Sequence, residues 1–225
     1  ALRVKARLSS IRRIMKELVD FGFLKRHKSQ FIITESGKKV NNINLSPYDA
    51  MIALSLTSDI SMEKLLDVAS SIDLARRVRR SILPFDITPS KILLDWVNEM
   101  SLDSIKSRHG SNYNDHDIVE LGKYTSLSLQ KISSLISDRK LKKRINILQD
   151  RVRYGIKTDL AETALMRLPS FSRDNKRALA RSFFNSGINS INKLAKEQPE
   201  TLVKSFGISS ELASQLVLEA KAEIR

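Results

Sequence analysis

Helix-start signals recur through the middle of this chain, and almost nothing between them favours strands. Ser46-Pro47 and Thr88-Pro89 each place a capping hydroxyl before a proline at the first helical position. Apolar residues recur at helical spacing in the runs that follow, and Gly155 ends the last of these runs. Trp96 lies on one such apolar stripe, which favours a place in the core. The pattern predicts a mostly α fold with a bundle of helices over residues 46–157.

The first 45 residues read differently. An amphipathic helix ending at Gly22 is followed by two short apolar runs around the basic stretch KRHKSQ, which is typical of a β-hairpin. The apolar stripe of this helix consists of Leu8, Ile11, Met15, Leu18 and Val19. A helix followed by a basic two-stranded wing is typical of the second half of a winged-helix domain. The sequence therefore predicts a partial winged-helix domain over residues 1–45. Because the first half is missing and Ala1 is not an initiator Met, we expect a piece of a larger protein.

Residues 158–225 contain five predicted short helices with Ser, Thr or Pro starts and Gly stops. The stretch LPSFSRDNKRALARSFFNSGI (168–188) has the layout of a helix–hairpin–helix, a unit whose tight turn presents N–H groups to a phosphate. Serines at 170 and 172 stand where such a turn usually has glycine, so the tight turn is not expected as such. Ser172 is instead predicted to cap the second helix, whose apolar stripe falls on Leu179, Phe183 and Phe184. Arg173, Lys176 and Arg177 would then share a phosphate at that helix end, unless they form only a solvated basic face.

The composition points to a polyanionic partner. The formal net charge is +14, divided into +8 over residues 1–45, +1 over 46–150 and +5 over 151–225. A strongly basic globular chain favours nucleic acid as its partner. We expect single-stranded or branched DNA. There is no cysteine, no secretory signal and no apolar run long enough for a membrane span, so we expect a cytoplasmic protein.

The residues contain no catalytic constellation. Gly37-Lys38 and Gly122-Lys123 lack the rest of a phosphate-binding loop. The acidic stretch Asp115–Asp117 suggests either a metal ligand set or the acids that a helix N-terminus prefers, and the second interpretation is favoured. We therefore predict no catalytic residue, no metal site and no cofactor in this chain.

A family resemblance covers nearly the whole chain. Arg151-Val152-Arg153-Tyr154-Gly155-Ile156, followed by Asp159-Leu160, resembles the motif R-x-K-Y-G-V…E-L of archaeal Hjm-type (Holliday-junction-migration) DNA repair helicases. LLDWVNEM (93–100) and GFL…TESGKKV (22–40) are also similar to this family, which belongs to the superkiller-like branch of superfamily two. The resemblance implies motor domains N-terminal to this chain that use ATP and Mg²⁺. It also implies a winged helix that braces the motor, a "ratchet" helix against single-stranded DNA, and a terminal helix–hairpin–helix.

The chain departs from the family on the ratchet helix. Where relatives commonly carry an arginine and, two turns later, a base-stacking tryptophan, this sequence has Glu120 and Leu127. Tyr124 lies one turn before Leu127 and either takes over stacking or packs in the core. These substitutions suggest a divergent paralogue. The remaining predicted nucleic-acid contacts are Arg12, Arg13, Lys28, Lys131, Arg151, Arg153 and Arg181.

The sequence therefore predicts the nucleic-acid-binding C-terminal region of an ATP-dependent DNA repair helicase that grips single-stranded DNA without sequence specificity. One alternative is a free-standing winged-helix and helix–hairpin–helix DNA-binding module without a motor. A second is a protein-interaction scaffold derived from a helicase.

Overall fold

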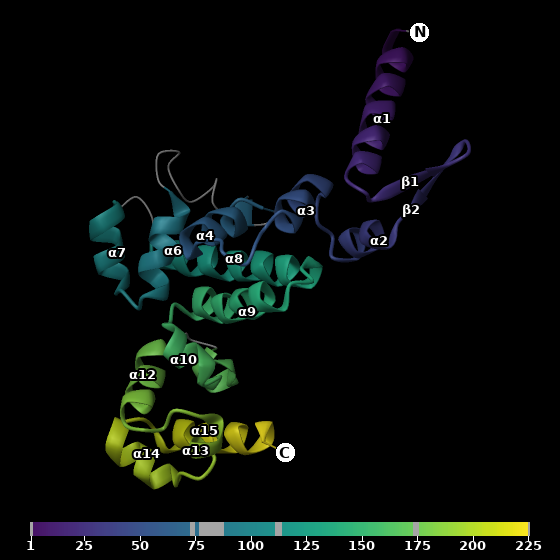
Figure 1. Cartoon of the computed structure of the whole chain (residues 1–225). Helices are drawn as coiled ribbons and strands as arrows, with labels where there is room; N and C mark the ends of the chain where they lie inside the picture. Colours follow the sequence, from purple (N-terminus) through teal and green to yellow (C-terminus); the bar gives the residue numbers. More distant parts are fainter. Residues whose placement is uncertain (1, 73–74, 77–87, 111–113, 173–175, 225) are drawn as a thin grey trace.

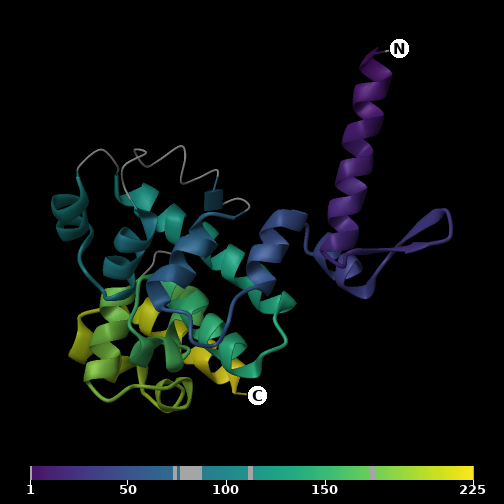
Figure 2. The same ribbon diagram turned by 45° about the horizontal axis from the view of Figure 1, so that its top comes forward.

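The computed structural model describes residues 2–72, 75–76, 88–110, 114–172 and 176–224, with the backbone alone for residues 2–9. The chain begins with a long helix and a two-stranded hairpin that stand out from the remaining helices in both views (Figures 1 and 2). The bounds of the first elements are α1 Leu2–Asp20, β1 Leu24–His27, β2 Gln30–Ile33 and α2 Glu35–Asn42. The predicted helix and hairpin are thus present. The basic stretch, however, lies mostly in the strands, because His27 pairs with Gln30 and only two residues form the turn.

The apolar side of α1 is not covered by the rest of the described chain. Ile11 is 55% exposed and Ile14 is 47% exposed, and Phe31 on the neighbouring strand is 44% exposed. Only the end of the helix reaches the core, where Leu18 packs beside Phe23. The predicted helix is confirmed, but the described residues do not bury its whole apolar stripe, because Ile11 stays exposed.

The bundle follows, and its helices are α3 Pro47–Leu54, α4 Met62–Ser70, α6 Pro89–Val97, α7 Leu102–His109, α8 Asp115–Leu135 and α9 Arg139–Tyr154. The starts predicted at Ser46-Pro47 and Thr88-Pro89 are confirmed. Ser46 Oγ accepts a hydrogen bond from the backbone N–H of Asp49 at 3.1 Å, whereas Thr88 makes no such bond. Ser71 ends α4, and residues 73–74 and 77–87 lie outside the described part of the chain.

The centre of the bundle is the pair α8 and α9, which lie side by side (Figure 1). Trp96 from α6 is fully buried against them, and its Nε1 donates a hydrogen bond to the carbonyl oxygen of Val152 at 2.7 Å. Gly122 makes this approach possible, since a Cβ added there would lie 2.6 Å from the same carbonyl oxygen. The predicted core position of Trp96 is confirmed.

The C-terminal elements form a second group of short helices beneath α9 in Figure 1. They are α10 Thr158–Glu162, η1 Leu165–Arg167, α11 Pro169–Ser172, α12 Arg177–Asn185, α13 Ile191–Leu194, α14 Pro199–Phe206 and α15 Ser210–Glu223. The Phe183 ring stands edge-on to Phe171 at a centroid distance of 5.5 Å and lies 4.2 Å from Phe206. The predicted apolar stripe of α12 is therefore confirmed, with Phe183 fully buried.

The described residues form two hydrophobic cores that share α9. Leu141, Ile145 and Leu148 belong to the bundle core, whereas Ile147 and Tyr154 pack into the core of the C-terminal helices. The mostly α fold class is confirmed. No helix in the described part of the chain is long and apolar enough to cross a bilayer.

Candidate nucleic-acid interface

The outer side of α8 carries the two positions where the family resemblance implies DNA contacts. Glu120 and Leu127 are seven residues apart, close to two helical turns, and therefore share one face of α8. Leu127 is 40% exposed, and Glu120 Oε1 lies 3.1 Å from Lys123 Nζ in an ion pair. This face thus presents an apolar side chain and an internally compensated charge pair.

Tyr124 lies one turn before Leu127 and is half-buried. Lys123 Nζ lies 5.6 Å from the centroid of its ring, at the distance of a cation–π contact. The ring therefore contributes to packing and keeps an edge toward solvent, and its role in base stacking stays a prediction.

The acidic stretch at the start of α8 is accounted for by helix capping. Asn114 Oδ1 accepts the backbone N–H of Asp117 at 3.0 Å, and Asp117 Oδ2 accepts the backbone N–H of Asn114 at 2.8 Å. Asp115 pairs with Lys106 at 2.7 Å, and this hydrogen bond raises the pKa of the Lys106 ammonium. Within the described ranges, no group of three or more acids or histidines is placed to hold a metal ion.

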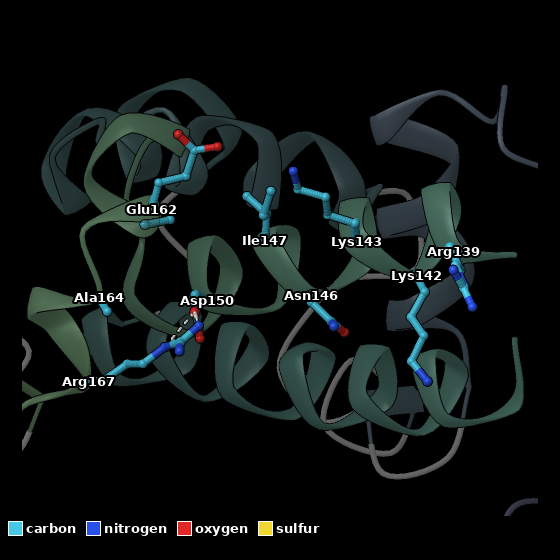
Figure 3. Close-up of a pocket in the computed structure, with 10 residues that line it drawn as sticks. Arg139, Lys142, Lys143, Asn146, Ile147, Asp150, Glu162, Ala164 and Arg167 are labelled. Carbon is cyan, nitrogen blue, oxygen red and sulfur yellow. Dashed lines mark hydrogen bonds and ion pairs between the residues drawn. The ribbon is translucent and has the colours of Figure 1, made fainter. Parts of the chain in front are cut away.

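A polar stripe, basic at its N-terminal end, runs along α9 on the side away from the bundle core. Asp138 begins the helix by accepting the backbone N–H groups of Lys140 (2.8 Å) and Leu141 (3.1 Å) at Oδ1. The stripe has the helical spacing i, i+3, i+4, i+7 and i+11, and its residues are Arg139, Lys142, Lys143, Asn146 and Asp150. These side chains line one wall of an open groove of about 390 Å³ whose other wall is formed by Ala161, Glu162, Ala164 and Arg167 (Figure 3).

The two ends of this groove differ in charge. At one end Arg167 reaches Asp150, with Nη2 at 2.6 Å and Nε at 3.0 Å from Oδ2, as Figure 3 shows. At the other end stand Arg139, Lys142 and Lys143, and none of these three forms an ion pair with another residue in the described ranges. The groove is therefore most positive at the N-terminal end of α9.

The sequence analysis did not predict this stripe as a site, although the run RKLKKR (139–144) contains five basic residues. The net charge of residues 46–150 is only +1, and this sum does not reveal a local concentration of cations on one helix face. Arg144 belongs to the same run but points elsewhere, and its guanidinium donates to the carbonyl oxygens of Ser58 and Ile60.

Two of the arginines predicted to contact nucleic acid, Arg177 and Arg181, join the C-terminal helices to the bundle, and their contact with nucleic acid stays a prediction. Arg177 lies over the Trp96 ring at 4.2 Å and donates to the carbonyl oxygens of Gly155 and Met100, both at 2.9 Å. Burial lowers the pKa of this guanidinium. Gly155 has φ +66°, and a Cβ there would collide with the Trp96 ring, so the motif glycine is required by this joint.

Arg181 makes a second contact across the same joint. Its guanidinium donates to both carboxylate oxygens of Asp159 (2.8 Å each) and to Glu99, with Nε at 2.9 Å from Oε2. Glu99 Oε1 also accepts the backbone N–H of Lys157 at 2.9 Å, and Glu99 itself has φ +64°. The hydrogen bond with Asp159 raises the pKa of Arg181 above its ordinary value. Arg151 donates to the carbonyl oxygen of Val97 at 3.3 Å, and burial lowers its pKa.

The predicted cap at Ser172 is wrong. Ser172 ends the separate helix α11, and its hydroxyl donates weakly to the carbonyl oxygen of Pro169 at 3.4 Å. The N-cap of α12 is Lys176, four residues later, which makes no side-chain cap bond. Ser170 is buried, and its N–H and hydroxyl both bind Glu219 on α15 (3.0 and 2.8 Å), so it holds the fold together rather than opening a turn. Arg173 lies outside the described residues.

The remaining predicted contacts are scattered. Arg12 and Arg13 are exposed on α1, with Arg13 Nε 3.8 Å from Glu17. Lys28 is exposed in the hairpin turn at φ +54°, and Lys131 Nζ donates to the carbonyl oxygen of Asn44 at 3.1 Å. Arg153 is exposed beside the Tyr154 ring at 5.3 Å, close to the last turn of α9. The structure does not bring these residues together with the helix–hairpin stretch.

Comparison with known proteins shows that this chain is similar to archaeal DNA helicases. It is 25% identical over 92% of its length to the ATP-dependent DNA helicase Hel308 of Thermoplasma volcanium, 24% identical over 93% to that of Caldivirga maquilingensis, and 22% identical over 98% to that of Pyrobaculum calidifontis. The chain spans about a third of the length of these relatives. No family model matches it. The resemblance drawn from the sequence is confirmed, and the chain corresponds to the C-terminal region of archaeal Hel308 DNA helicases.

Proposed function

We propose that this chain is the nucleic-acid-binding C-terminal region of an ATP-dependent DNA helicase and that it grips single-stranded DNA without reading its sequence. The observation that carries the proposal is the match to proteins named DNA helicases along more than nine-tenths of the chain. A net charge of +14 supports a polyanionic ligand. A role in DNA repair, with ATP and Mg²⁺ bound by motor domains elsewhere in the parent protein, follows from the same family.

The grip rests on phosphate charge rather than on stacking. An aromatic ring that stacks on a base contributes roughly 1–3 kcal/mol, and Leu127 stands where the family has tryptophan. Glu120 stands where the family has arginine, and it compensates the charge of Lys123 on the same helix. Binding by cations elsewhere on the surface fits these substitutions, because phosphate contacts carry no information about the bases.

The N-terminal elements serve as a brace in this proposal. Apolar residues of α1 and β2 border a groove of about 530 Å³, lined by Ile11, Arg12, Met15, Lys16, Val19, Arg26 and Phe31. Exposed apolar surface of this kind marks a protein contact, and we assign it to the remainder of a winged-helix domain and to a motor domain. Replacing Arg12 and Arg13 with alanine should therefore weaken DNA binding less than removing cations nearer the C-terminus.

The interaction-scaffold alternative keeps one supporting observation, the exposed Leu127 on a face that has lost both family contacts. A scaffold does not need affinity for nucleic acid. Measuring that affinity therefore separates the two proposals.

The test is fluorescence anisotropy of labelled single-stranded oligonucleotides of several unrelated sequences, titrated with the 225-residue chain at increasing salt. We expect similar affinity for every sequence and a linear fall of log K with log[salt]. We also expect no ATP turnover, because the chain contains no GxxxxGK[ST] loop. Absence of binding at low salt, or binding that salt does not weaken, would contradict the proposal. The sequence of the full-length protein distinguishes a helicase from a free-standing module. A helicase would contain a phosphate-binding loop and a DExH box.

A further inference from the structure

We propose that the groove between α9 and the α10–η1 segment is a phosphate-binding site for one strand of nucleic acid, and that it replaces the substituted face of α8 as the principal contact. The inference rests on the proposed function, since it locates the grip that this function requires. It names a site that neither the family motif nor the hairpin stretch predicts.

The three cations at one end of the groove have no ion-pair partner among the described residues. Arg139, Lys142 and Lys143 line the groove, are exposed, and form no ion pair in the described part of the chain. By contrast, Arg177 and Arg181 are held by carbonyl and carboxylate groups. A cation that is already paired contributes little to a new ligand, whereas an unpaired one exchanges only water and counterions for a phosphate.

The spacing of the groove residues along α9 matches an extended strand. Arg139 and Lys143 are one helical turn apart, which separates their Cα atoms by about 6 Å along the axis. Arg139 and Asp150 span about 16 Å along the same face, so the groove is long enough to follow a strand over several atoms of its backbone. The capping by Asp138 fixes the start of α9, and Arg139 is the first residue of this helix.

The chemistry of the groove lining also suits a sugar–phosphate backbone. Asn146 Oδ1 accepts the hydroxyl of Ser133 at 2.6 Å, which turns the carbonyl oxygen toward α8 and leaves the amide NH₂ as a donor in the groove. Ile147 and Ala164 add apolar surface suited to a sugar ring. A lining with a donor and apolar atoms beside a cationic end fits a sugar–phosphate backbone better than it fits an acidic peptide, which would also need backbone donors and acceptors in the groove.

The acidic residues of the groove determine at which end a phosphate binds. Asp150 is neutralised by Arg167, while Glu162 is exposed on the opposite wall without an ion-pair partner among the described residues. A phosphate is therefore drawn to the end formed by Arg139, Lys142 and Lys143 and repelled from the Glu162 end. Removal of the Glu162 charge should strengthen binding, a gain that damage to the fold does not produce.

The experiment compares two charge-removing triple variants of the full chain. The groove variant is Arg139→Gln, Lys142→Gln, Lys143→Gln, and the matched control is Lys64→Gln, Lys91→Gln, Lys204→Gln, which removes three exposed lysines from α4, α6 and α14. Both lower the net charge equally. Affinity for a labelled oligo-dT strand is measured by anisotropy over a range of salt, with circular dichroism as a check of folding.

We expect the groove variant to bind about tenfold more weakly at low salt and to flatten the slope of log K against log[salt] by roughly 0.7 for each lost contact. The control should keep most of the affinity and the slope. Glu162→Gln alone should raise the affinity about two- to threefold at low salt and have less effect at high salt.

The outcomes separate this inference from the proposed function. If the unmodified chain does not bind the strand, the proposed function fails before the groove is tested. If it binds and the groove variant loses no more affinity than the control, the groove is not the site and the inference is overturned. An unchanged affinity of Glu162→Gln at low salt also counts against phosphate in the groove.

Discussion

The guanidinium of Arg177 lies over the ring of Trp96, 4.2 Å from its centroid, and thereby joins the C-terminal helices to the bundle. The two residues are far apart in sequence, and each is held by further bonds, Trp96 to Val152 and Arg177 to Gly155 and Met100. Arg177, which the sequence predicts as a phosphate ligand, thus also forms part of the joint between the two cores.

Arg177→Ala should lower the free energy of unfolding by about 2–4 kcal/mol, because it removes the cation–π contact and leaves two part-buried carbonyl oxygens without donors. Urea unfolding followed by circular dichroism measures this change. Arg139→Ala is the control, since its side chain is exposed and unpaired in the described structure, and it should change the stability by less than about 0.5 kcal/mol. Equal effects of the two substitutions would show that Arg177 does not hold the joint.

The ion pair of Arg181 with Asp159 predicts a dependence of stability on acid pH. Its hydrogen bond lowers the pKa of the Asp159 carboxyl in the native state. The ion pair therefore stabilises the fold fully above the pKa that Asp159 has in the unfolded chain, near pH 4. This stabilisation is lost as the pH falls through the lower native pKa. Asp159→Asn should lose less stability than the unmodified chain when urea unfolding is compared between about pH 6 and about pH 3. An identical loss in the two proteins would place the acid sensitivity elsewhere.

Gly122→Ala tests the close approach of α8 to α9. Helix propensity alone would make alanine more stable by about 1 kcal/mol. The added Cβ would instead lie 2.6 Å from the carbonyl oxygen of Val152, and we expect a net destabilisation of about 1–3 kcal/mol from the displaced backbone. Gln130→Ala, on the exposed side of the same helix, should be nearly neutral. Thermal unfolding shows whether Gly122→Ala raises or lowers the stability. A more stable variant would contradict the close packing of α8 against α9.

Lys28→Asn should strengthen the hairpin, because Lys28 has φ +54° and asparagine adopts this region more readily. The gain should reach up to about 1 kcal/mol, measured as slower amide exchange in β1 and β2. The same variant removes a cation that was predicted to contact nucleic acid. If oligonucleotide affinity falls as much as in the α9 groove variant, the hairpin contributes more to binding than we propose.

Local features of this fold could be read from the sequence because their causes are local. The start of α3 at Ser46-Pro47 and the end of α9 at Gly155 depend on residues within one turn. The partners of Arg177 and Arg181 could not be read in this way, because Trp96 and Glu99 lie about 80 residues away and a charge pattern does not reveal whether a guanidinium is already bound. The cap assigned to Ser172 failed for a related reason. The buried pairing of Ser170 with Glu219 accompanies a separate short helix, and α12 begins only after Lys176.

Trp96 is the single tryptophan of the chain, and it sits with its indole N–H bound to one helix and its ring covered by an arginine from the C-terminal helices. Its emission therefore reports on one place in the molecule, the joint between the two cores. Separation of the C-terminal helices would admit water to one face of the indole and shift its emission to the red, while α8 and α9 keep their helical signal. The fluorescence of Trp96 can therefore follow this joint without an added label.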